Sequence, residues 1–290
     1  MTRAPRVLVP RRAWPDDRFP DWAVAALRAA GAHVGETDGP WPRRWDAALL
    51  PAVRAADAAP LSARAVGRVT ALLDVPPRPG DRLLRGADVV ATSAALAAAW
   101  RGGRVRVVRP AVQACAAAAT AGPVVRIASV APLHWSAGHE HAVAAVAALL
   151  REGTRVELRV AGDGPAREAV LFTIFDLGVE RAVTLVGGEE RSVVREADAV
   201  VVAAVEDRAW SGLLHAFACG VPAVASDLPT TRELGGARLV PPRDPGALAD
   251  ALSALVSDPA LRASLAASGR RAAVTDVAAC GRALLGTLAR

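Results

Sequence analysis

The chain has 290 residues, of which 52% are hydrophobic and 22% are charged, and its formal net charge at pH 7 is +6. This length is sufficient for two domains of ordinary size, each with its own core. No apolar run reaches the length of a membrane span and we find no leader with a cleavage site, so we expect a cytoplasmic protein rather than an integral membrane protein.

The basic residues are all arginine, because the sequence contains 35 basic residues and no lysine. Together with the abundance of Ala, Gly and Pro, this bias is typical of a GC-rich bacterial genome. The arginines are scattered, with doublets only at positions 11–12, 43–44 and 270–271. Scattered charge and scarce aromatic residues argue against a nucleic-acid partner and allow at most a peripheral contact with a membrane.

The three cysteines, Cys115, Cys219 and Cys280, form no Cys-x-x-Cys pair and have no metal-binding spacing with the five histidines. We therefore expect three buried thiols in a reducing compartment and no metal centre. Histidines at positions 134, 139 and 141 are interpreted as the polar start of a helix rather than as metal ligands.

The first half of the chain alternates between short strands and helices, although Pro-rich segments at 10–20, 40–42 and 76–79 interrupt the pattern. The apolar runs predict a strand at 6–10, a helix leading into a strand over 21–34, a strand within 45–53, and a strand followed by a helix over 86–100. Another strand ends near Pro110, and residues 111–122 read as a linker. We therefore expect one domain over 1–115 and a second over 116–290.

The second half alternates more clearly. Strands are predicted at 124–130, 155–162, 182–188, 198–205, 221–226 and 236–242, and helices at 139–153, 165–179, 191–197, 211–218 and 244–273, with a last helix running to Arg290. Apolar strands that alternate with helices indicate a parallel, doubly wound sheet with helices on both faces. The predicted fold class is α/β, with two Rossmann-like domains.

Seven motifs in this half occur in a recognisable order. They are "LHWSAGHEHAVAAV", "RVAGDGPAREAVL", "DLGVERAVTLVGG", "ADAVVVAA", "HAFACGVPAVASD", "TTREL" and "LVPPRDPGALADAL". In this order they resemble the nucleotide-binding domain of retaining glycosyltransferases with the GT-B fold, over residues 124–265. The first half is similar to the family's acceptor domain only at "GADVVATSAAL" and "VVRPAVQ", so we expect that domain to be reduced.

The resemblance implies retaining transfer of a hexose from a nucleotide diphosphate sugar to an acceptor, with no cofactor and no metal ion. The donor would be held by the second domain. The alternative is a catalytically degenerate relative, which would serve as a partner or activator of another glycosyltransferase or as a binding protein. A shortened first domain and several substituted site positions favour that alternative.

The expected donor site lies at the carboxyl ends of the strands, where helix N-termini present unpaired N–H groups to phosphate. The helix over 211–218 would offer the N–H groups of Ser211, Gly212 and Leu213 to a diphosphate. The turn at Gly162 and Gly164 would lie at the same edge of the sheet, although it also reads as an ordinary tight turn.

Two acidic positions of the family carry its donor contacts. The resemblance places Asp207 at the first, which approaches the sugar, and His215 at the second, which binds the ribose. Both also read as ordinary polar residues. Glu233, in "TTREL", matches a further acidic position of the family and equally suits a helix start.

The cationic positions of the family are not kept. Pro132 and Ala137 stand where its relatives carry Arg and Lys to neutralise the diphosphate. The remaining candidates for that charge are Arg208, Arg191 and Arg232. Trp210 stands in a stretch that is Gly-rich in the family, where an indole could close the space that a phosphate needs.

Overall fold

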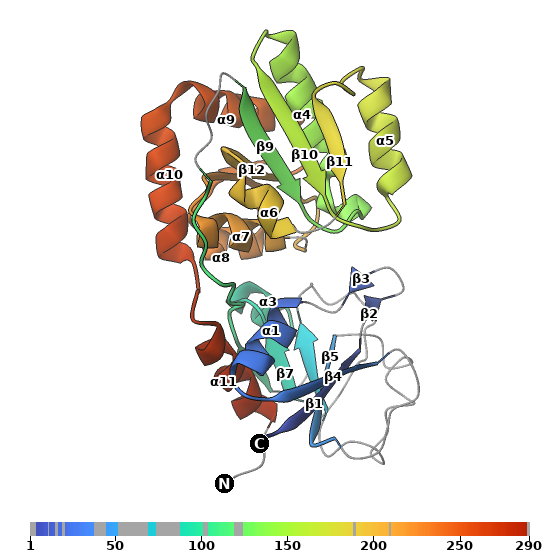
Figure 1. The fold of residues 1–290 in the computed structure, drawn as a ribbon, viewed down its shortest axis with the longest axis vertical. Coiled ribbons are helices and arrows are strands. Elements are labelled where there is room, and N and C mark those ends of the chain that lie inside the picture. The colour runs from blue at the N-terminus through green and yellow to red at the C-terminus, as the bar shows by residue number, and fades with distance from the viewer. Residues whose placement is uncertain are drawn as a thin grey trace. The chain divides into compact units, whose positions relative to one another are not determined.

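A computed structural model describes most of the chain, namely residues 4–10, 12–14, 17–18, 21–37, 45–51, 69–73, 88–100, 104–118, 124–187, 190–208 and 210–288. The chain divides into two compact units, shown in Figure 1. The first comprises Met1–Val112 with Val274–Arg290, and the second comprises Gln113–Ala273.

The first unit is built on a six-stranded parallel sheet in the order β4-β1-β5-β6-β7-β8. The strands are β1 (Arg6–Pro10), β4 (His33–Thr37), β5 (Ala47–Pro51), β6 (Val69–Leu73), β7 (Asp88–Ala91) and β8 (Val105–Val107). A separate two-stranded antiparallel pair, β2 (Arg12–Trp14) and β3 (Asp17–Arg18), lies outside this sheet.

Helices cover both faces of this first sheet. Helices α1 (Asp21–Ala29) and α11 (Val277–Leu288) share one apolar core with β1, β5, β6 and β7, while α3 (Ala94–Ala99) packs on the other face. Side chains of β6 alternate accordingly, with Leu72 in the first core and Leu73 in the second. This alternation follows from the period of two residues in a strand.

The second unit has a six-stranded parallel sheet in the order β11-β10-β9-β12-β13-β14. The strands are β9 (Val125–Val130), β10 (Val156–Ala161), β11 (Val183–Val186), β12 (Ala199–Val202), β13 (Ala223–Ser226) and β14 (Arg238–Val240). Taken in chain order, these strands have the 3-2-1-4-5-6 arrangement of dinucleotide-binding folds, in which the direction of winding reverses between the first and fourth strands. That reversal lies here between β9 and β12.

The second sheet also separates two apolar cores. Helices α4 (His139–Arg151), α5 (Arg167–Asp176) and α9 (Pro245–Ser257) contribute to one, and α6 (Glu190–Arg195) and α7 (Ser211–Cys219) to the other. Figure 1 shows α10 (Pro259–Ala272) following α9. The predicted helical range 244–273 is divided into these two helices, and Asp244 and Asp258, each followed by Pro, cap their N-termini.

The two doubly wound parallel sheets confirm the predicted fold class, with two differences. We expected the first domain to be reduced, but its sheet has six strands, as many as the sheet of the second domain. The last helix, predicted as part of the second domain over 116–290, belongs to the first unit. Helix α11 buries Cys280, Leu284 and Leu288 in the core of that unit, so apolar packing fixes its place.

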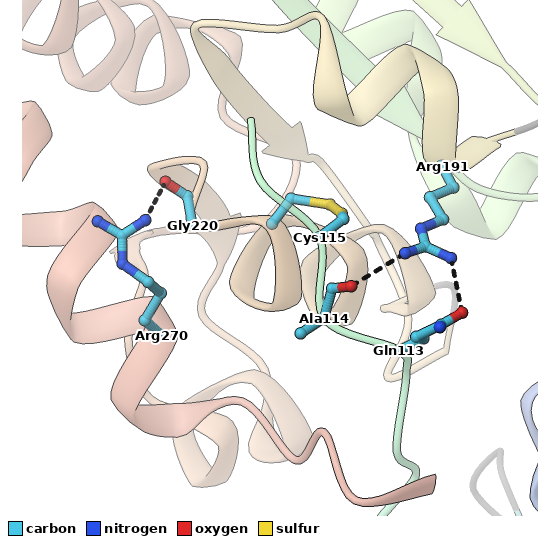
Figure 2. Close-up of a disulfide and its surroundings, with 7 residues drawn as sticks. Gln113, Ala114, Cys115, Arg191, Gly220 and Arg270 are labelled. Atoms are coloured by element: carbon cyan, nitrogen blue, oxygen red, sulfur yellow. Dashed lines mark hydrogen bonds between the residues drawn. A yellow bond between two sulfur atoms is a disulfide. The ribbon is translucent and has the colours of Figure 1, made fainter. Parts of the chain in front are cut away.

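The segment after the first unit is also held more firmly than a linker would be. Its main chain crosses the ends of two helices: the N–H of Cys115 donates to the carbonyl oxygen of Ala218 (3.1 Å), and the N–H of Ala118 donates to that of Arg195 (2.7 Å). The Arg191 guanidinium donates to Gln113 Oε1 (3.2 Å) and to the carbonyl oxygen of Ala114 (3.1 Å), as Figure 2 shows.

The prediction of three free thiols is wrong for two of them. Cys115 and Cys219 form a disulfide, drawn in Figure 2, which joins this segment to the C-terminal end of α7. Cys280 is a free, buried thiol whose Sγ donates to the carbonyl oxygen of Arg109 (3.4 Å), and burial raises its pKa. None of the described helices combines the length and the apolar character that a bilayer span requires.

Candidate functional site

The site is built at the reversal point of the second sheet. Strands β9 and β12 are neighbours, and each is followed by a loop at its carboxyl end, described over 131–138 and 203–208. The two loops are bonded to each other, because the N–H of Val205 donates to the carbonyl oxygen of Ser136 (2.9 Å). Ligands of open parallel sheets bind outside the carboxyl ends of the strands at such a point.

The loop after β9 forms a single 3-10 turn, η2 (Trp135–Ala137). His134 stabilises its start, because its Nδ1 accepts from the N–H (3.3 Å) and lies 2.9 Å from the hydroxyl of Ser136. Ala137 is buried and Pro132 is half-buried. Because neither side chain is ionisable, this loop offers no charge at these two positions. The histidine in this loop is therefore a turn-forming residue, in line with the sequence interpretation.

His139 begins helix α4 and is buried, with 1% of its surface exposed. Its Nε2 donates to the carbonyl oxygen of Ala131 (3.2 Å), and its Nδ1 lies 2.8 Å from the hydroxyl of Ser129. Burial lowers the pKa of His139 to about 4, although its backbone hydrogen bonds oppose the shift. The ring is therefore neutral near pH 7, and its Nδ1 accepts from the Ser129 hydroxyl. The ring joins strand β9 to the loop that follows it.

The turn after β10 packs directly against the same loop. The N–H of Leu133 donates to the carbonyl oxygen of Asp163 (2.9 Å), and Gly162 and Gly164 have φ angles of 152° and 149°. A Cβ at Gly162 would overlap the carbonyl oxygen of Ala131, and one at Gly164 would lie 2.5 Å from that of Leu133. Both glycines are thus needed for backbone conformation and close approach, which suits the tight-turn interpretation.

Helix α7 begins at the other side of the reversal point. Gly212, in its first turn, packs against the end of β9 so closely that a Cβ would overlap the carbonyl oxygen of Val130. The N–H groups of Ser211 and Gly212 have no acceptor within the helix, whereas the N–H of Leu213 donates to the carbonyl oxygen of Trp210 (3.0 Å). His215 is half-buried, one turn further along.

Trp210 directly precedes this helix, and 6% of its surface is exposed. Its indole is therefore packed within the second unit rather than presented to solvent. Trp210 stands where the family has a Gly-rich stretch, and the protein accommodates this large side chain by burying it.

Asp207 lies in the loop after β12 and is buried, with 9% of its surface exposed. Both of its carboxylate oxygens accept from the N–H of Thr230 (3.2 and 3.1 Å), and Oδ2 also accepts from the hydroxyl of Thr230 (3.0 Å). Burial raises the pKa of Asp207. The hydrogen bonds from Thr230 lower it, and the charge of Glu233 raises it further.

Two of the three arginines considered for the diphosphate are bonded elsewhere. Arg191 binds Gln113 and the main chain at Ala114, and Arg232 forms an exposed, bidentate ion pair with Asp227. Arg208 is half-buried in the loop between β12 and α7, beside Asp207. Of the three arginines, Arg208 is therefore the nearest in the chain to the N-terminus of α7.

The structure thus brings most of the predicted site residues to one edge of the second sheet. The loops and the helix start that meet there carry Gly162, Gly164, Asp207, Arg208, Ser211, Gly212, Leu213 and His215. Glu233 is linked to this edge through its electrostatic interaction with Asp207. Sequence reasoning missed Thr230, whose Pro-Thr-Thr context marks a helix start but does not name the partner of its hydroxyl. Within the described ranges, no three His, Cys, Asp or Glu side chains gather as a metal site would require.

Comparisons with known proteins agree with this architecture. Residues 124–258 match the profile of the family described as "Glycosyl transferases group 1". A curated relative, the exopolysaccharide phosphotransferase SCO2592 of Streptomyces coelicolor, is 36% identical over 130 residues. That match covers 42% of this chain and spans only 14% of the relative.

Solved structures resemble the chain over nearly its whole length. Anabaena Alr3699/HepE, in complex with UDP and glucose, has a TM-score of 0.78 at 15% identity and covers 99% of this chain and 100% of its own. Sucrose-phosphate synthase from Thermosynechococcus elongatus has a TM-score of 0.76 at 17% identity, with coverages of 99% and 98%.

A third structure, a mutant of S. aureus TarM in complex with Fondaparinux, alpha-GlcNAc-glycerol and UDP, has a TM-score of 0.68 at 12% identity. It covers 84% of this chain, which spans 55% of TarM. At these identities the likeness shows the fold. The match to the glycosyl transferases group 1 profile is confined to residues 124–258, which lie within the second unit.

Proposed function

We propose that this chain transfers a hexose from a nucleotide diphosphate sugar to an acceptor, with retention of configuration and without a metal ion. Retention would follow if the leaving phosphate assists attack on the same face of the sugar. The donor would lie at the reversal point of the second sheet, beside the loops 131–138 and 203–208 and the start of α7. Solved structures of the same fold that hold UDP, or UDP with glucose, support this choice of ligand.

The observation that carries the proposal is the contact between Gly212 and the carbonyl oxygen of Val130. It sets the start of α7 against the end of β9, which is the neighbour of β12 at the reversal point. The N–H groups of Ser211 and Gly212, together with the positive end of the helix dipole, would then bind a diphosphate. The N–H of Leu213 contributes less than the sequence suggested, because it already donates to Trp210.

Arg208 would supply the cationic contact that Pro132 and Ala137 cannot. Such a contact stabilises the charge that develops on the diphosphate as the glycosidic bond breaks, and losing one donor of this kind typically costs about 10²–10³ in rate. We assign His215 to the ribose, because a ring nitrogen can accept a hydrogen bond from a hydroxyl.

One observation favours the alternative, a non-catalytic relative that serves as a partner or activator of another glycosyltransferase. Arg191 and Arg232 are both bonded at some distance in the chain from the start of α7, so two of the three candidate arginines are engaged away from the proposed diphosphate site. The two functions differ in turnover rather than in fold.

Calorimetric titration with UDP, GDP and ADP tests the donor site. Binding of one nucleotide in the micromolar range, followed by its release from the matching nucleotide sugar in the presence of a glycan acceptor mixture, would support the transferase. Binding without release would support the partner role. No heat with any of the three nucleotides would contradict the proposed donor site.

A further inference from the structure

Asp207 and Thr230 form a buried pair that joins two loops of the second unit. Thr230 lies in the first turn of α8 (Pro229–Leu234), and only 1% of its surface is exposed. Its N–H and its hydroxyl both donate to the Asp207 carboxylate, at 3.0 to 3.2 Å. The start of α8 is therefore fixed to the loop that leads from β12 to α7.

This arrangement replaces an ordinary helix cap. The residue at the N-cap of α8 is Leu228, whose side chain has no oxygen to accept from the first N–H groups of the helix. Asp207, 23 residues earlier in the chain, supplies that acceptor instead. A cap from a distant loop does more than stabilise a helix, because it also fixes the loop that provides it.

The loop 203–208 is consequently held on two sides. Val205 donates to Ser136 in the loop after β9, and Asp207 accepts from Thr230 on α8. Only three residues, 208 to 210, separate Asp207 from the start of α7, and the last of them, Trp210, is buried. Small changes at Asp207 would therefore be passed on to Arg208 and to the N–H groups of Ser211 and Gly212.

We propose that Asp207 and Thr230 are positioning residues of the donor site, which together hold the loop between β12 and α7 in the shape that binds a nucleoside diphosphate. This assignment rests on the proposed function. It gives Asp207 a role different from the sugar contact that family resemblance suggests, and it gives Thr230 a role for the first time.

The electrostatics of the pair point in the same direction. Burial raises the pKa of Asp207, as does the negative charge of Glu233 on the same helix as Thr230, and the hydrogen bonds from Thr230 counteract both. Thr230 therefore helps to keep a buried carboxylate ionised, and an ionised carboxylate makes the stronger hydrogen bonds.

The test compares Thr230→Val with Thr231→Val. Both substitutions remove a hydroxyl from a threonine that is 1% exposed at the start of α8. The Thr231 hydroxyl donates to the carbonyl oxygen of Ser226 and accepts from the N–H of Leu228 (2.9 Å), but it does not contact Asp207. Thr231→Val thus reports the effect of weakening the helix start alone.

The probe is whichever of UDP, GDP and ADP binds the wild-type chain most tightly, measured by calorimetry. We expect Thr230→Val to weaken binding about tenfold, and Thr230→Ser, which keeps the hydroxyl, to restore it. Thr231→Val should lower the melting temperature while leaving the affinity within about twofold of wild type. Equal losses from the two valine variants, or no loss from Thr230→Val, would overturn the proposal.

A double-mutant cycle separates this inference from the proposed function. If the two residues act as one unit, Asp207→Ala and Asp207→Ala/Thr230→Val should bind the nucleotide equally weakly. Additive losses would show that Thr230 acts independently of Asp207. If the wild-type chain binds none of the three nucleotides, the proposed function fails, and the donor role of the pair fails with it, whereas the cycle measured on urea unfolding still reports the contact itself.

Discussion

Cys115 and Cys219 are joined by a disulfide although 104 residues separate them in the sequence. The bond fastens the segment after the first unit to the C-terminal end of α7, the helix whose other end forms the candidate donor site. Main-chain hydrogen bonds from Cys115 to Ala218 and from Ala117 to Cys219 hold the two segments together beside it. The C-terminal end of α7 is thereby linked to the segment around Cys115, whereas its N-terminal end packs against β9.

Reduction of this disulfide should destabilise the second unit. Closing a loop of this length restricts the unfolded chain, and removing such a bond typically costs about 2–4 kcal/mol. We expect a thiol reductant to lower the urea midpoint of the wild-type chain and to have no effect on Cys115→Ser. Mass spectrometry of the unfolded, unreduced chain should find one alkylated cysteine, Cys280.

Cys280→Ser is the matched control for this experiment. Cys280 is free and buried in the first unit, so its replacement should shift stability without removing the response to reductant. A reductant effect that persists in Cys115→Ser, or three alkylated cysteines in the untreated chain, would contradict the disulfide.

Replacing Gly212 should damage both stability and nucleotide binding. A Cβ at this position would overlap the carbonyl oxygen of Val130, which is main chain and cannot rotate away. Gly212→Ala therefore has to displace the start of α7 from β9, and overpacking of this kind costs about 1–3 kcal/mol. We expect a lower urea midpoint and at least a tenfold loss of nucleotide affinity by calorimetry.

Gly286→Ala provides the comparison. Gly286 lies within α11, and a Cβ there would meet nothing within 4 Å. Ala is a better helix former than Gly, so this variant should gain about 0.5–1 kcal/mol and bind nucleotide as the wild type does. If Gly212→Ala behaves in the same way, the close approach of α7 to β9 is not needed for the site.

Replacing Arg208 should weaken nucleotide binding selectively. Arg208→Ala removes the cation that we assign to the diphosphate, whereas Arg232→Ala removes one from an exposed pair with Asp227, where little stability is expected. By calorimetry, Arg208→Ala should bind nucleoside diphosphate at least tenfold more weakly and the corresponding nucleoside unchanged. Equal affinities for the two variants would remove Arg208 from the site.

The order of strands and helices in the second unit follows from local sequence patterns. Helix α7 was predicted at 211–218 and found at Ser211–Cys219, and it ends at Gly220, which has a φ of 69°. Such predictions succeed because apolar periodicity, Asp-Pro starts and a terminal Gly all act within a few residues. In the first unit, by contrast, β6 (Val69–Leu73) was not predicted, because its five residues carry no clear alternation.

The details of the site depend instead on contacts between residues far apart in the chain. No local pattern shows that Cys115 meets Cys219, that α11 packs in the first unit, or that Thr230 donates to Asp207. Each of these pairings arises only when the sheet has placed its loops side by side. Family resemblance therefore indicated which loops to expect at the candidate site, and the structure was needed to show which partners their side chains have.

His139 should make the chain sensitive to acid. Its folded-state pKa of about 4 lies below the ordinary value of 6.5, because the neutral ring is buried. The unfolded chain therefore takes up a proton at a pH where the folded chain does not, and stability falls as the pH decreases from 6.5 towards 4, by up to about 3 kcal/mol. Urea unfolding between pH 7 and pH 4 should show a smaller decrease in His139→Gln, whose neutral side chain does not titrate. His141→Gln, a substitution on the same turn of α4 that keeps His139, should retain the wild-type decrease. An unchanged pH dependence in His139→Gln would show that this imidazole is not the buried neutral group that joins β9 to its loop.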